Sequence, residues 1–343
     1  MQDKASWTDL YRRAVGQVPA VSGIYHDNYL VRRDGTSYVI RVNRKLEEPD
    51  VEPRMYAEAS VLAALGPVDI AVPELFHDSG EHEFMVISYL PGRRIADIYP
   101  PGTSVPDSLI EFIRTTMSEL YRVEREALGA VLRESPWRWV SGNDAFLPDL
   151  LSWLTKVYDS SSVEEKECMR AVGLPTDLFD FRNFSLDNSL RTFRLCHGDL
   201  QRENLLVASR YRYSVLDWEM AVWGDPVWDI ASHMHRAAYP PDQAQSALQR
   251  LLASCPDWTA SVSDYQAYDV YLKVEQYRSL ILDCVRNLRI GGPWDEVTRA
   301  RKVATYYRKL VAAGFEQLSE TEVLGLFERC WSIRTRDRQS RER

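Results

Sequence analysis

The sequence predicts an α+β fold of two lobes, a small β-rich lobe over residues 1–90 and a larger, mainly helical lobe over residues 91–343. Three observations support this prediction. Short β-prone runs with turn residues between them fill the first part of the chain, the pair Pro91-Gly92 breaks it, and amphipathic helical patterns follow. A chain of 343 residues, 45% of them hydrophobic, is long enough to bury the cores of two lobes.

The first lobe is expected to consist mainly of strands. Asp34-Gly35 joins two β-prone runs and is a strong hairpin signal. Apolar residues then recur at helical spacing, and a continuous apolar run ends at the break. The expected segments are a turn of small residues at 21–28 ("VSGIYHDN"), strands at 27–33, 37–43 and 83–90, and a helix at 54–65.

The second lobe is expected to be helical. Leu109, Ile113 and Met117 form one apolar stripe, which predicts an amphipathic helix. The basic tail, residues 334–343, is expected to be disordered because short polar chain ends usually are. The expected helices span 107–126, 264–288, 296–313 and 320–333.

Composition excludes several classes of function. A formal net charge of -8 argues against a nucleic-acid-binding protein, which normally needs a cationic surface. The apolar runs are too short to span a membrane, and the first residues lack the apolar segment of a secretory signal. Five scattered cysteines without a CxxC pair fit reduced thiols, so a cytoplasmic protein is expected.

Three features carry the candidate chemistry. The first is His197-Gly198-Asp199 with Asn204 five positions after the aspartate, and the second is Asp217 at the end of an apolar run. The third is the strand "YVIRV", followed by Glu58 on the predicted helix. Two aspartates and an asparagine that face one point can hold Mg²⁺ and accept a hydroxyl proton. Phosphoryl transfer requires this combination.

The two motifs "HGDLQRENLLV" and "LDWEMAVWGDPVWDIA" resemble those of the kinase-like phosphotransferases, in the aminoglycoside phosphotransferase and choline kinase branch. That branch shows HGD, four residues and N, then DWE, GDP and a further D, and the chain has every part. The resemblance extends from about residue 20 to residue 235. It implies a protein-kinase-like fold whose first lobe binds the nucleotide and whose second lobe carries catalysis and the substrate.

The resemblance implies roles for individual residues. Asp199 would be the catalytic base that orients the acceptor hydroxyl, and His197 would brace the catalytic loop. Asn204 and Asp217 would bind Mg²⁺ at the phosphates of ATP or GTP. Asp225 and Asp229 would be structural. The nucleotide would be held by the loop that contains Ser22 and Gly23, by Arg41 paired with Glu58, and by the hinge Ser88, Tyr89 and Leu90.

Several assignments have alternatives. Arg41 stands where protein kinases have a lysine, and its pair with Glu58 could instead be a simple surface ion pair. His233 and His235 are expected to be structural, because an i, i+2 pair on a helix points to different sides. Trp228 is expected in the core, whereas Trp218 and Trp223 could belong to the core or to a substrate wall.

The acceptor is expected to be a small hydroxylated molecule, since the gap between Asp217 and Gly224 is too short for a peptide-docking segment. Residues 264–343 hold 15 Lys and Arg against 12 Asp and Glu, which does not suit a polycationic aminoglycoside. Aromatic residues form flat apolar walls, which suit a neutral or weakly charged antibiotic such as a nucleoside or macrolide, which transfer would inactivate. The aromatic residues are Tyr265, Tyr268, Tyr271, Tyr277, Trp294, Tyr306 and Tyr307.

Two alternatives remain open. One is a metabolic kinase acting on choline, homoserine or a sugar. The other is a pseudokinase that binds a nucleotide without turnover, which the departure at Arg41 would favour and the intact Asp199, Asn204 and Asp217 oppose.

Overall fold

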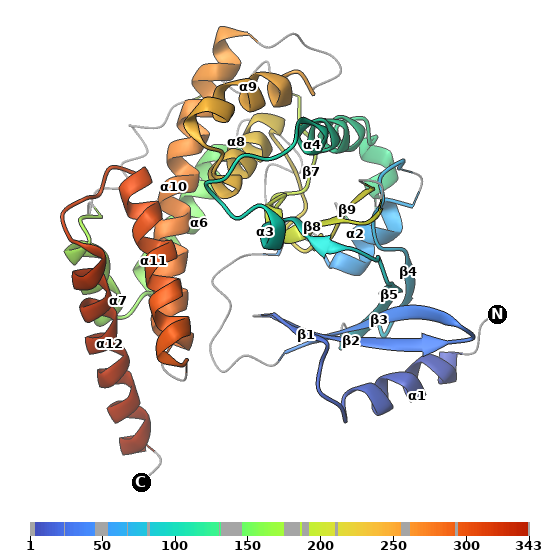
Figure 1. Ribbon diagram of the computed structural model, residues 1–343, viewed down its shortest axis with the longest axis horizontal. Coiled ribbons are helices and arrows are strands. Elements are labelled where there is room, and N and C mark those ends of the chain that lie inside the picture. Colours follow the sequence, from blue (N-terminus) through green and yellow to red (C-terminus); the bar gives the residue numbers. More distant parts are fainter. Residues whose placement is uncertain are drawn as a thin grey trace.

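The computed structural model has two lobes (Figure 1). The strands β1 to β3 lie at one end of the molecule with α1 beneath them, and the helices α8 to α12 lie at the other. The structure describes residues 4–341 except 24, 45–53, 67, 81–82, 130, 132–145, 175–185, 187–191, 210–211, 255–260 and 292–293.

The N-terminal lobe is built on a five-stranded antiparallel sheet in the order β1-β2-β3-β5-β4. Asp34 and Gly35 have φ values of 50° and 82°, as a tight hairpin turn between β2 and β3 requires. Arg41 lies opposite both Asn28 and Met85, so these residues share one face of the sheet. The strands are β1 (Val21–Ser22), β2 (His26–Arg33), β3 (Thr36–Asn43), β4 (Leu75–Asp78) and β5 (Phe84–Ser88).

Two helices flank this sheet. Helix α1 (Lys4–Ala14), which the sequence patterns did not predict, packs Trp7 against Ile40 and Val86 on the face opposite to Arg41. Helix α2 (Glu58–Ala64) begins four residues later than predicted, because Ala57 is extended with ψ at 128°. Glu58 therefore lies in the first turn, where the helix dipole favours a carboxylate.

The chain passes from one lobe to the other at the predicted break. After β5, Pro91 and Gly92 lead into β6 (Arg93–Arg94), which pairs with β8 (Leu205–Val207) of the second lobe. Gly92 has a φ of 156°, and a Cβ there would lie 3.0 Å from the carbonyl oxygen of Val207. Only glycine fits this close backbone crossing.

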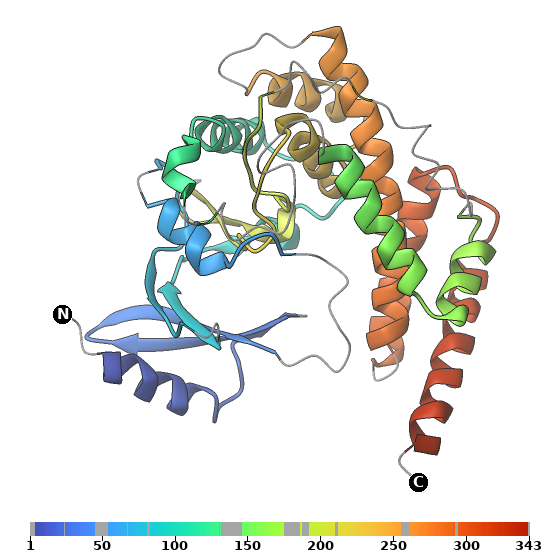
Figure 2. The ribbon, with the colours of Figure 1, turned by 180° about the vertical axis from the view of Figure 1, so that it is seen from behind.

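The C-terminal lobe is mainly helical. The long helix α10 packs against α6, α7, α8, α11 and α12, and Figures 1 and 2 both show α6 running beside it. The helices are α3 (Ile95–Ile98), α4 (Asp107–Leu120), α6 (Phe146–Ser160), α7 (Val163–Ala171), α8 (Pro226–Ala237), α9 (Pro241–Leu252), α10 (Val262–Ile290), α11 (Glu296–Ala312) and α12 (Glu320–Arg341).

The predicted helices of this lobe are confirmed with changed ends. The first ends at Leu120 as α4, and a separate 3-10 turn follows at Arg125–Leu128. The prediction of a disordered tail is wrong, because α12 continues to Arg341. Its sequence contains no glycine or proline after Gly325 to end the helix. Among the described residues, no helix has the length and apolar character needed to cross a membrane.

Short strands of the C-terminal lobe position the two motifs. Strand β7 (Arg194–Cys196) pairs with β10 (Val222–Gly224), and β8 lies between β6 and β9 (Tyr213–Val215). His197 directly follows β7, Asn204 directly precedes β8, and Asp217 comes two residues after β9. All three residues are therefore anchored at strand ends in the buried centre of this lobe.

Candidate active site

The loop His197-Gly198-Asp199 is fixed from below by α8. The carboxylate of Asp229 accepts hydrogen bonds from the backbone N–H of His197 at 3.2 Å and of Gly198 at 2.9 Å. Asp229 is fully buried, and burial raises its pKa to about 6. The predicted structural position of Asp229 thus corresponds to an anchor for the loop backbone.

The backbone conformation of the loop requires a glycine at Gly198. Its φ is 73°, and a Cβ there would lie 2.3 Å from the carbonyl oxygen of Met220. We expect Gly198→Ala to destabilise the fold by about 3 kcal/mol or more, because left-handed strain and a backbone clash add. Gly314→Ala is the control, since Gly314 has a φ of 82° with open space around its Cβ position.

Chemical denaturation measures the free energy of unfolding of both glycine variants. The account of Gly198 is wrong if Gly198→Ala is no less stable than Gly314→Ala, which should lose only about 1 kcal/mol.

His197 bridges the two motifs. Its Nδ1 accepts a hydrogen bond from the backbone N–H of Asp199 at 3.2 Å, and its Nε2 lies 3.1 Å from the carbonyl oxygen of Leu216 and donates to it. Burial lowers the pKa of His197 to about 4, so the ring is neutral at pH 7. These contacts are those of a residue that braces the loop against the segment before Asp217.

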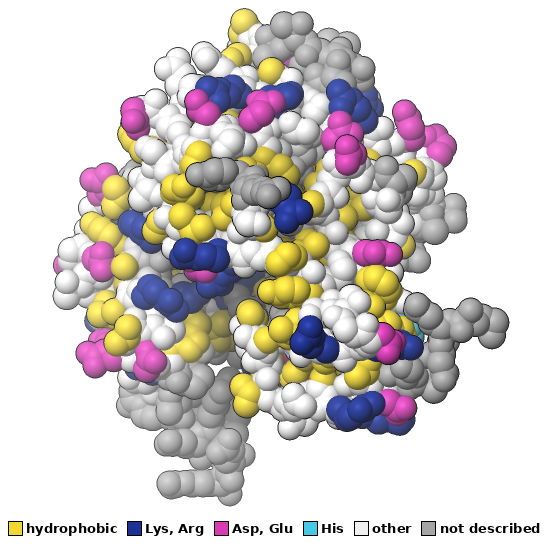
Figure 3. All heavy atoms as spheres, turned by 45° about the vertical axis from the view of Figure 1, so that its right-hand side comes forward, with side chains coloured by type: hydrophobic (Ala, Val, Ile, Leu, Met, Phe, Trp, Pro, Cys, Tyr) yellow, Lys and Arg dark blue, Asp and Glu magenta, His cyan; other side chains and the backbone are white. Residues whose placement is uncertain are grey.

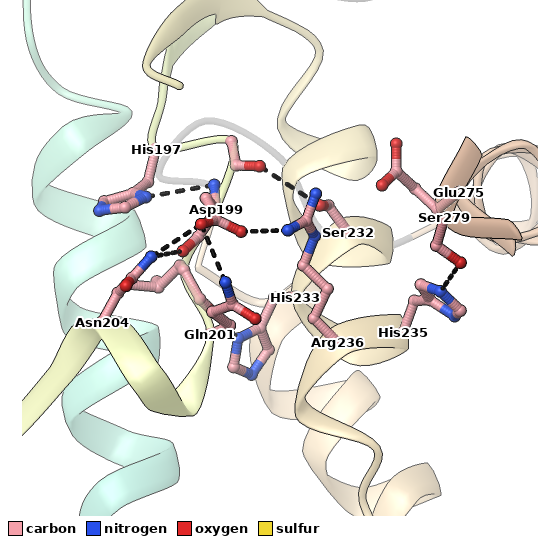
Figure 4. Close-up of polar contacts among 12 residues, drawn as sticks. His197, Asp199, Gln201, Asn204, Ser232, His233, His235, Arg236, Glu275 and Ser279 are labelled. Carbon is pink, nitrogen blue, oxygen red and sulfur yellow. Dashed lines mark hydrogen bonds and ion pairs between the residues drawn. The ribbon is translucent and has the colours of Figure 1, made fainter. Parts of the chain in front are cut away.

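Asp199 is held by side chains on both oxygens (Figure 4). Its Oδ2 accepts from Asn204 Nδ2 at 2.8 Å and from Gln201 Nε2 at 2.9 Å, while its Oδ1 pairs with Arg236 of α8. Asn204 Nδ2 also donates to the backbone carbonyl of Asp199 at 2.9 Å. The carboxylate therefore has one fixed orientation.

Gln201 and Arg236 were not predicted as site residues. Asp229, His233 and Arg236 follow one another at i, i+4 and i+7, which places them on one face of α8. His233 lies 2.5 Å from the carbonyl oxygen of Leu200, so this face is turned toward the catalytic loop. Helical spacing from Asp229 was the signal that could have identified Arg236.

A second group of charges joins the lobes. Arg41 Nη2 lies 2.5 Å from Asp217 Oδ1, and Arg41 Nε lies 3.1 Å from Glu58 Oε2. The other oxygen of Glu58 accepts from the backbone N–H of Trp218 at 3.0 Å. The side chains of Arg41 and Glu58 are 11% and 8% exposed, so the alternative of a surface ion pair is wrong.

The backbone of Asp217 is in the left-handed region, with a φ of 65°. Few non-glycine residues adopt this conformation outside functional or tightly constrained sites. The turn aims the carboxylate back at Arg41 of the N-terminal lobe instead of along the strand direction.

The pKa shifts in this group reflect burial and paired charge. Burial alone would lower the pKa of Arg41, but the carboxylates of Glu58 and Asp217 outweigh it and raise that pKa. Burial would raise the pKa of Asp217, but the charge of Arg41 outweighs it and lowers that pKa. Burial, followed by the charge of Asp217, raises the pKa of Glu219 to about 8.

Glu219, in the second motif, was not predicted as a site residue. Its Oε2 lies 3.5 Å from Arg41 Nη2, 3.4 Å from His26 Nδ1 and 3.3 Å from Arg54 Nη2. A cavity of about 380 Å³ opens here, with Arg41, Glu58, Glu219 and His26 in its lining. Glu219 thus belongs to the charged end of the interlobe site.

The donor set of Asn204 and Asp217 fits a magnesium ion. The backbone N–H of Leu216 donates to the carbonyl oxygen of Asn204 at 2.8 Å, so the two segments run side by side. The amide nitrogen of Asn204 is turned to Asp199, which leaves its side-chain oxygen as a hard ligand like the carboxylate of Asp217. The described residues hold no group of three or more His, Cys, Asp or Glu that could hold a metal, so Asn204 and Asp217 by themselves are a partial donor set.

The predicted nucleotide loop is a tight turn between β1 and β2. The backbone N–H of Gly23 donates to the carbonyl oxygen of His26 at 2.8 Å, and the carbonyl oxygen of Gly23 accepts from Arg44 at 2.7 Å. Ser22 precedes it as the last residue of β1 and is exposed. Ile24 lies outside the described residues.

Two N–H groups of the predicted hinge are used by the sheet itself. The backbone N–H of Ser88 donates to the carbonyl oxygen of Glu74 at 2.9 Å, and that of Tyr89 donates to Ser37 at 3.4 Å. Tyr89 is the first residue after β5, and Leu90 follows it. A base held by hinge N–H groups would therefore depend on Leu90 more than on the other two.

The remaining predicted residues have structural contacts. Asp225 caps α8 by accepting from the backbone N–H of Val227 at 2.9 Å, and it accepts from Tyr271 at 3.0 Å. His233 and His235 point to different partners, since His235 hydrogen-bonds with Ser279 at 2.7 Å. Three tryptophans are buried in the main core, which confirms the prediction for Trp228 and assigns Trp218 and Trp223 to the core as well.

Buried histidines predict a loss of stability in acid. Burial lowers the pKa of His26 and His235 to about 3 and of His197 and His233 to about 4. Above pH 6.5 these rings are neutral in both states. Below it, the unfolded chain binds protons that the folded chain does not, so stability falls until the folded pKa is reached.

For one such ring the loss between pH 7 and pH 5 is about 2 kcal/mol. Urea unfolding at both values should therefore show that His233→Asn loses less stability than the wild type by about this amount. Equal losses for the two proteins would show that His233 is not a neutral buried ring.

The chain was compared with protein families and with curated proteins. The profile of the phosphotransferase enzyme family (APH) matches residues 17–262, which include both motifs. No curated protein gave a significant match.

Solved structures share the fold at low identity. An aminoglycoside phosphotransferase in complex with GDP and kanamycin has a TM-score of 0.57 at 14% identity and covers 90% of this chain and 99% of its own. Macrolide 2′-phosphotransferase from Brachybacterium faecium has a TM-score of 0.52 at 19% identity, with coverage of 92% and 99%. Choline kinase from Streptococcus pneumoniae has a TM-score of 0.55 at 13% identity, with coverage of 89% and 98%. These similarities confirm the protein-kinase-like fold.

Proposed function

Because the chain belongs to the phosphotransferase enzyme family, we propose that it transfers the γ-phosphate of ATP or GTP to a hydroxyl of a small-molecule antibiotic and so inactivates it. One observation carries the proposal. Arg41 and Glu58 of the N-terminal lobe meet Asp217 of the C-terminal lobe, beside the loop that fixes Asp199. Such a site has separate places for phosphate charge and for an acceptor hydroxyl.

Asp199 is the proposed catalytic base. Asn204, Gln201 and Arg236 hold its carboxylate, so the acceptor hydroxyl meets an oriented proton acceptor. The hydroxyl oxygen forms a bond to the γ-phosphorus as the bond from that phosphorus to the β–γ bridging oxygen breaks. The hydroxyl proton passes to Asp199, and the products are a phosphate monoester and a nucleoside diphosphate.

The second group of charges, at Arg41, Glu58 and Asp217, is proposed to bind the phosphates of the nucleotide. Asn204 and Asp217 would hold Mg²⁺, which when bound neutralises charge on the nucleotide phosphates. Arg41 supplies a planar guanidinium that Glu58 keeps in place, which suits a phosphate clamp. His197 keeps the two motifs together through Asp199 and Leu216.

The nucleoside end of the donor would lie between the turn at Ser22 and Gly23 and the hinge at Ser88 to Leu90. A structural relative solved in complex with GDP and kanamycin supports a nucleotide as the donor. Backbone recognition at Leu90 is compatible with either ATP or GTP. We expect the enzyme to act in the cytoplasm, where nucleoside triphosphates are available.

A neutral or weakly charged acceptor, such as a nucleoside or macrolide, remains the proposal over a polycationic aminoglycoside. The aromatic residues give less support than the sequence suggested, because Tyr268, Tyr271 and Tyr306 are buried in the cores. The macrolide phosphotransferase among the structural relatives supports this class, whereas the relative in complex with kanamycin supports an aminoglycoside. The choline kinase supports a metabolic kinase as the second candidate.

Mass spectrometry of products tests the proposal. A mixed pool of macrolides, nucleosides, aminoglycosides, sugars, choline and homoserine is incubated with the enzyme, Mg²⁺ and either ATP or GTP. We expect a phosphorylated antibiotic. Phosphorylated choline, homoserine or sugar alone would support the metabolic kinase, and nucleotide binding without any phosphorylated product would support the pseudokinase.

A further inference from the structure

A group of cationic side chains lies between the catalytic loop and the nucleotide turn. It consists of Arg236 on α8, Arg286 on α10, and Lys302 and Lys309 on α11, and we call it the basic wall. Asp283 of α10 ties it together, with Lys309 Nζ 2.5 Å and Arg286 Nη1 3.9 Å from its carboxylate. These residues come from three helices that pack against one another.

The basic wall reaches both ends of the candidate site. At one end Arg236 is paired with Oδ1 of Asp199 (Figure 4). At the other end Arg286 Nη2 donates to the hydroxyl of Tyr25 at 3.0 Å, in the turn between β1 and β2. A substrate whose hydroxyl lies at Asp199 would therefore have the wall beside it. Figure 3 shows Lys and Arg side chains gathered around an acidic one at a hollow between the parts of the molecule.

The four cations of the wall have acidic neighbours. Among the described residues, Lys309 and Arg286 lie against Asp283, and Arg236 pairs with Asp199. The nearby carboxylate of Glu275 is neutralised, because Arg278 lies 2.7 Å from it and both side chains are buried. Burial lowers the pKa of Lys302, the charge of Asp283 opposes this shift, and the charges of Arg301 and Arg286 lower the pKa further. An anion placed here would relieve this repulsion.

We propose that the acceptor carries an anionic group, a carboxylate or a phosphate, that binds the basic wall while its hydroxyl lies at Asp199. The proposal rests on the proposed function and narrows its weakly charged acceptor to one that carries a single anionic group. The transfer step is unchanged, since the anionic group takes no part in bond making. Arg236 then contributes to both tasks, because it orients Asp199 and adds positive charge beside the acceptor.

The nucleotide phosphates are a less suitable occupant of the wall. Their charge is met by Arg41, which lies 2.5 Å from the proposed metal ligand Asp217. Arg236 and Lys309 instead adjoin Asp199 and the helices of the C-terminal lobe. A polycationic aminoglycoside would be repelled here, since such ligands are bound by clustered carboxylates.

Binding of one sugar scaffold in different charge states tests the proposal without turnover. Saturation-transfer NMR compares glucuronate, glucose 6-phosphate, glucose and glucosamine, each with the enzyme, Mg²⁺ and a non-hydrolysable ATP or GTP analogue. We expect glucuronate or glucose 6-phosphate to bind at least about tenfold more tightly than glucose, with glucosamine weakest. The two acids distinguish carboxylate from phosphate recognition. Binding of glucose or glucosamine that equals that of both acids would overturn the proposal.

Substitutions in the basic wall test whether its side chains bind the anionic group. Lys309→Met should abolish the preference for the acids and raise the KM of an anionic acceptor about tenfold, with the KM of the nucleotide unchanged. Arg308→Met is the control, because Arg308 is an exposed residue of the same helix as Lys309. If Lys309→Met does not fold, Lys302→Met provides the same measurement. A raised KM for the nucleotide instead would assign the wall to the donor and overturn the proposal.

Failure of the two proposals can be told apart. Absence of transfer to every acceptor would contradict the proposed function, whereas the NMR comparison still decides whether the wall binds anions. Transfer to neutral or cationic acceptors only, with equal binding of the four sugars, would contradict the anionic acceptor and leave the phosphotransferase intact.

Discussion

Asp199→Asn is expected to lower kcat for phosphoryl transfer by about 10²- to 10⁴-fold, which is the usual contribution of a general base. The amide keeps the size of the carboxylate but cannot accept the hydroxyl proton. The donor site lies at Arg41 and Asp217, so the affinity for the nucleotide should stay within about twofold of the wild type. Steady-state kinetics and nucleotide titration measure the two quantities separately.

Asp269→Asn is the matched control for that variant, because Asp269 is an exposed residue on α10 that belongs to neither charged group. It should keep wild-type kinetics. A wild-type kcat for Asp199→Asn would show that the carboxylate does not act in the chemical step. A loss confined to nucleotide affinity would assign Asp199 to the donor site.

Asp217→Asn is expected to reduce transfer by about 10²- to 10³-fold, because it removes negative charge at the proposed metal site. The concentration of Mg²⁺ needed for half-maximal activity should rise at least about tenfold. The fold should tolerate this change, since asparagine adopts the left-handed conformation of Asp217 more readily than most residues. Activity is measured against a titration of Mg²⁺ at saturating nucleotide.

Asp34→Asn controls for the backbone conformation, because Asp34 also has a positive φ, 50°, in the exposed turn between β2 and β3. That variant should behave as the wild type. An unchanged Mg²⁺ requirement in Asp217→Asn, with melting temperature preserved, would contradict the assignment of Asp217 as a ligand.

The motifs allowed much of the site to be predicted from sequence. Asp199, Asn204 and Asp217 lie at the ends of short strands, so local spacing already indicated that they come together. The pair of Arg41 and Glu58 was also predicted, and the structure adds that Asp217 lies against the same guanidinium. Residues within or next to a motif could be predicted because a few local turns determine their positions.

Contacts that depend on the packing of helices distant in sequence could not be predicted from the sequence. Arg236 reaches Asp199 only because α8 is anchored under the loop through Asp229. Helix α1 went unpredicted, although Trp7, Leu10, Tyr11 and Ala14 recur at helical spacing, because its apolar stripe is short.

The near balance of charge in residues 264–343 also gave no indication that these charged residues lie in different parts of the fold. Glu275 and Arg278 pair with each other in the core, whereas Lys309 pairs with Asp283 between α10 and α11. Composition counts all these charges alike, and only the fold shows which of them are paired in the core.

The central claim is that the enzyme transfers a phosphoryl group from a nucleoside triphosphate to an acceptor hydroxyl. The most direct measurement uses ATP and GTP labelled with ¹⁸O at the γ-phosphate and its β–γ bridge, with unlabelled acceptors and mass spectrometry of the products. The account predicts a phosphate monoester that retains the three terminal labelled oxygens and gains its fourth oxygen from the acceptor, while the bridging label stays on the diphosphate. Labelled inorganic phosphate as the only product, with every acceptor unmodified, would contradict it.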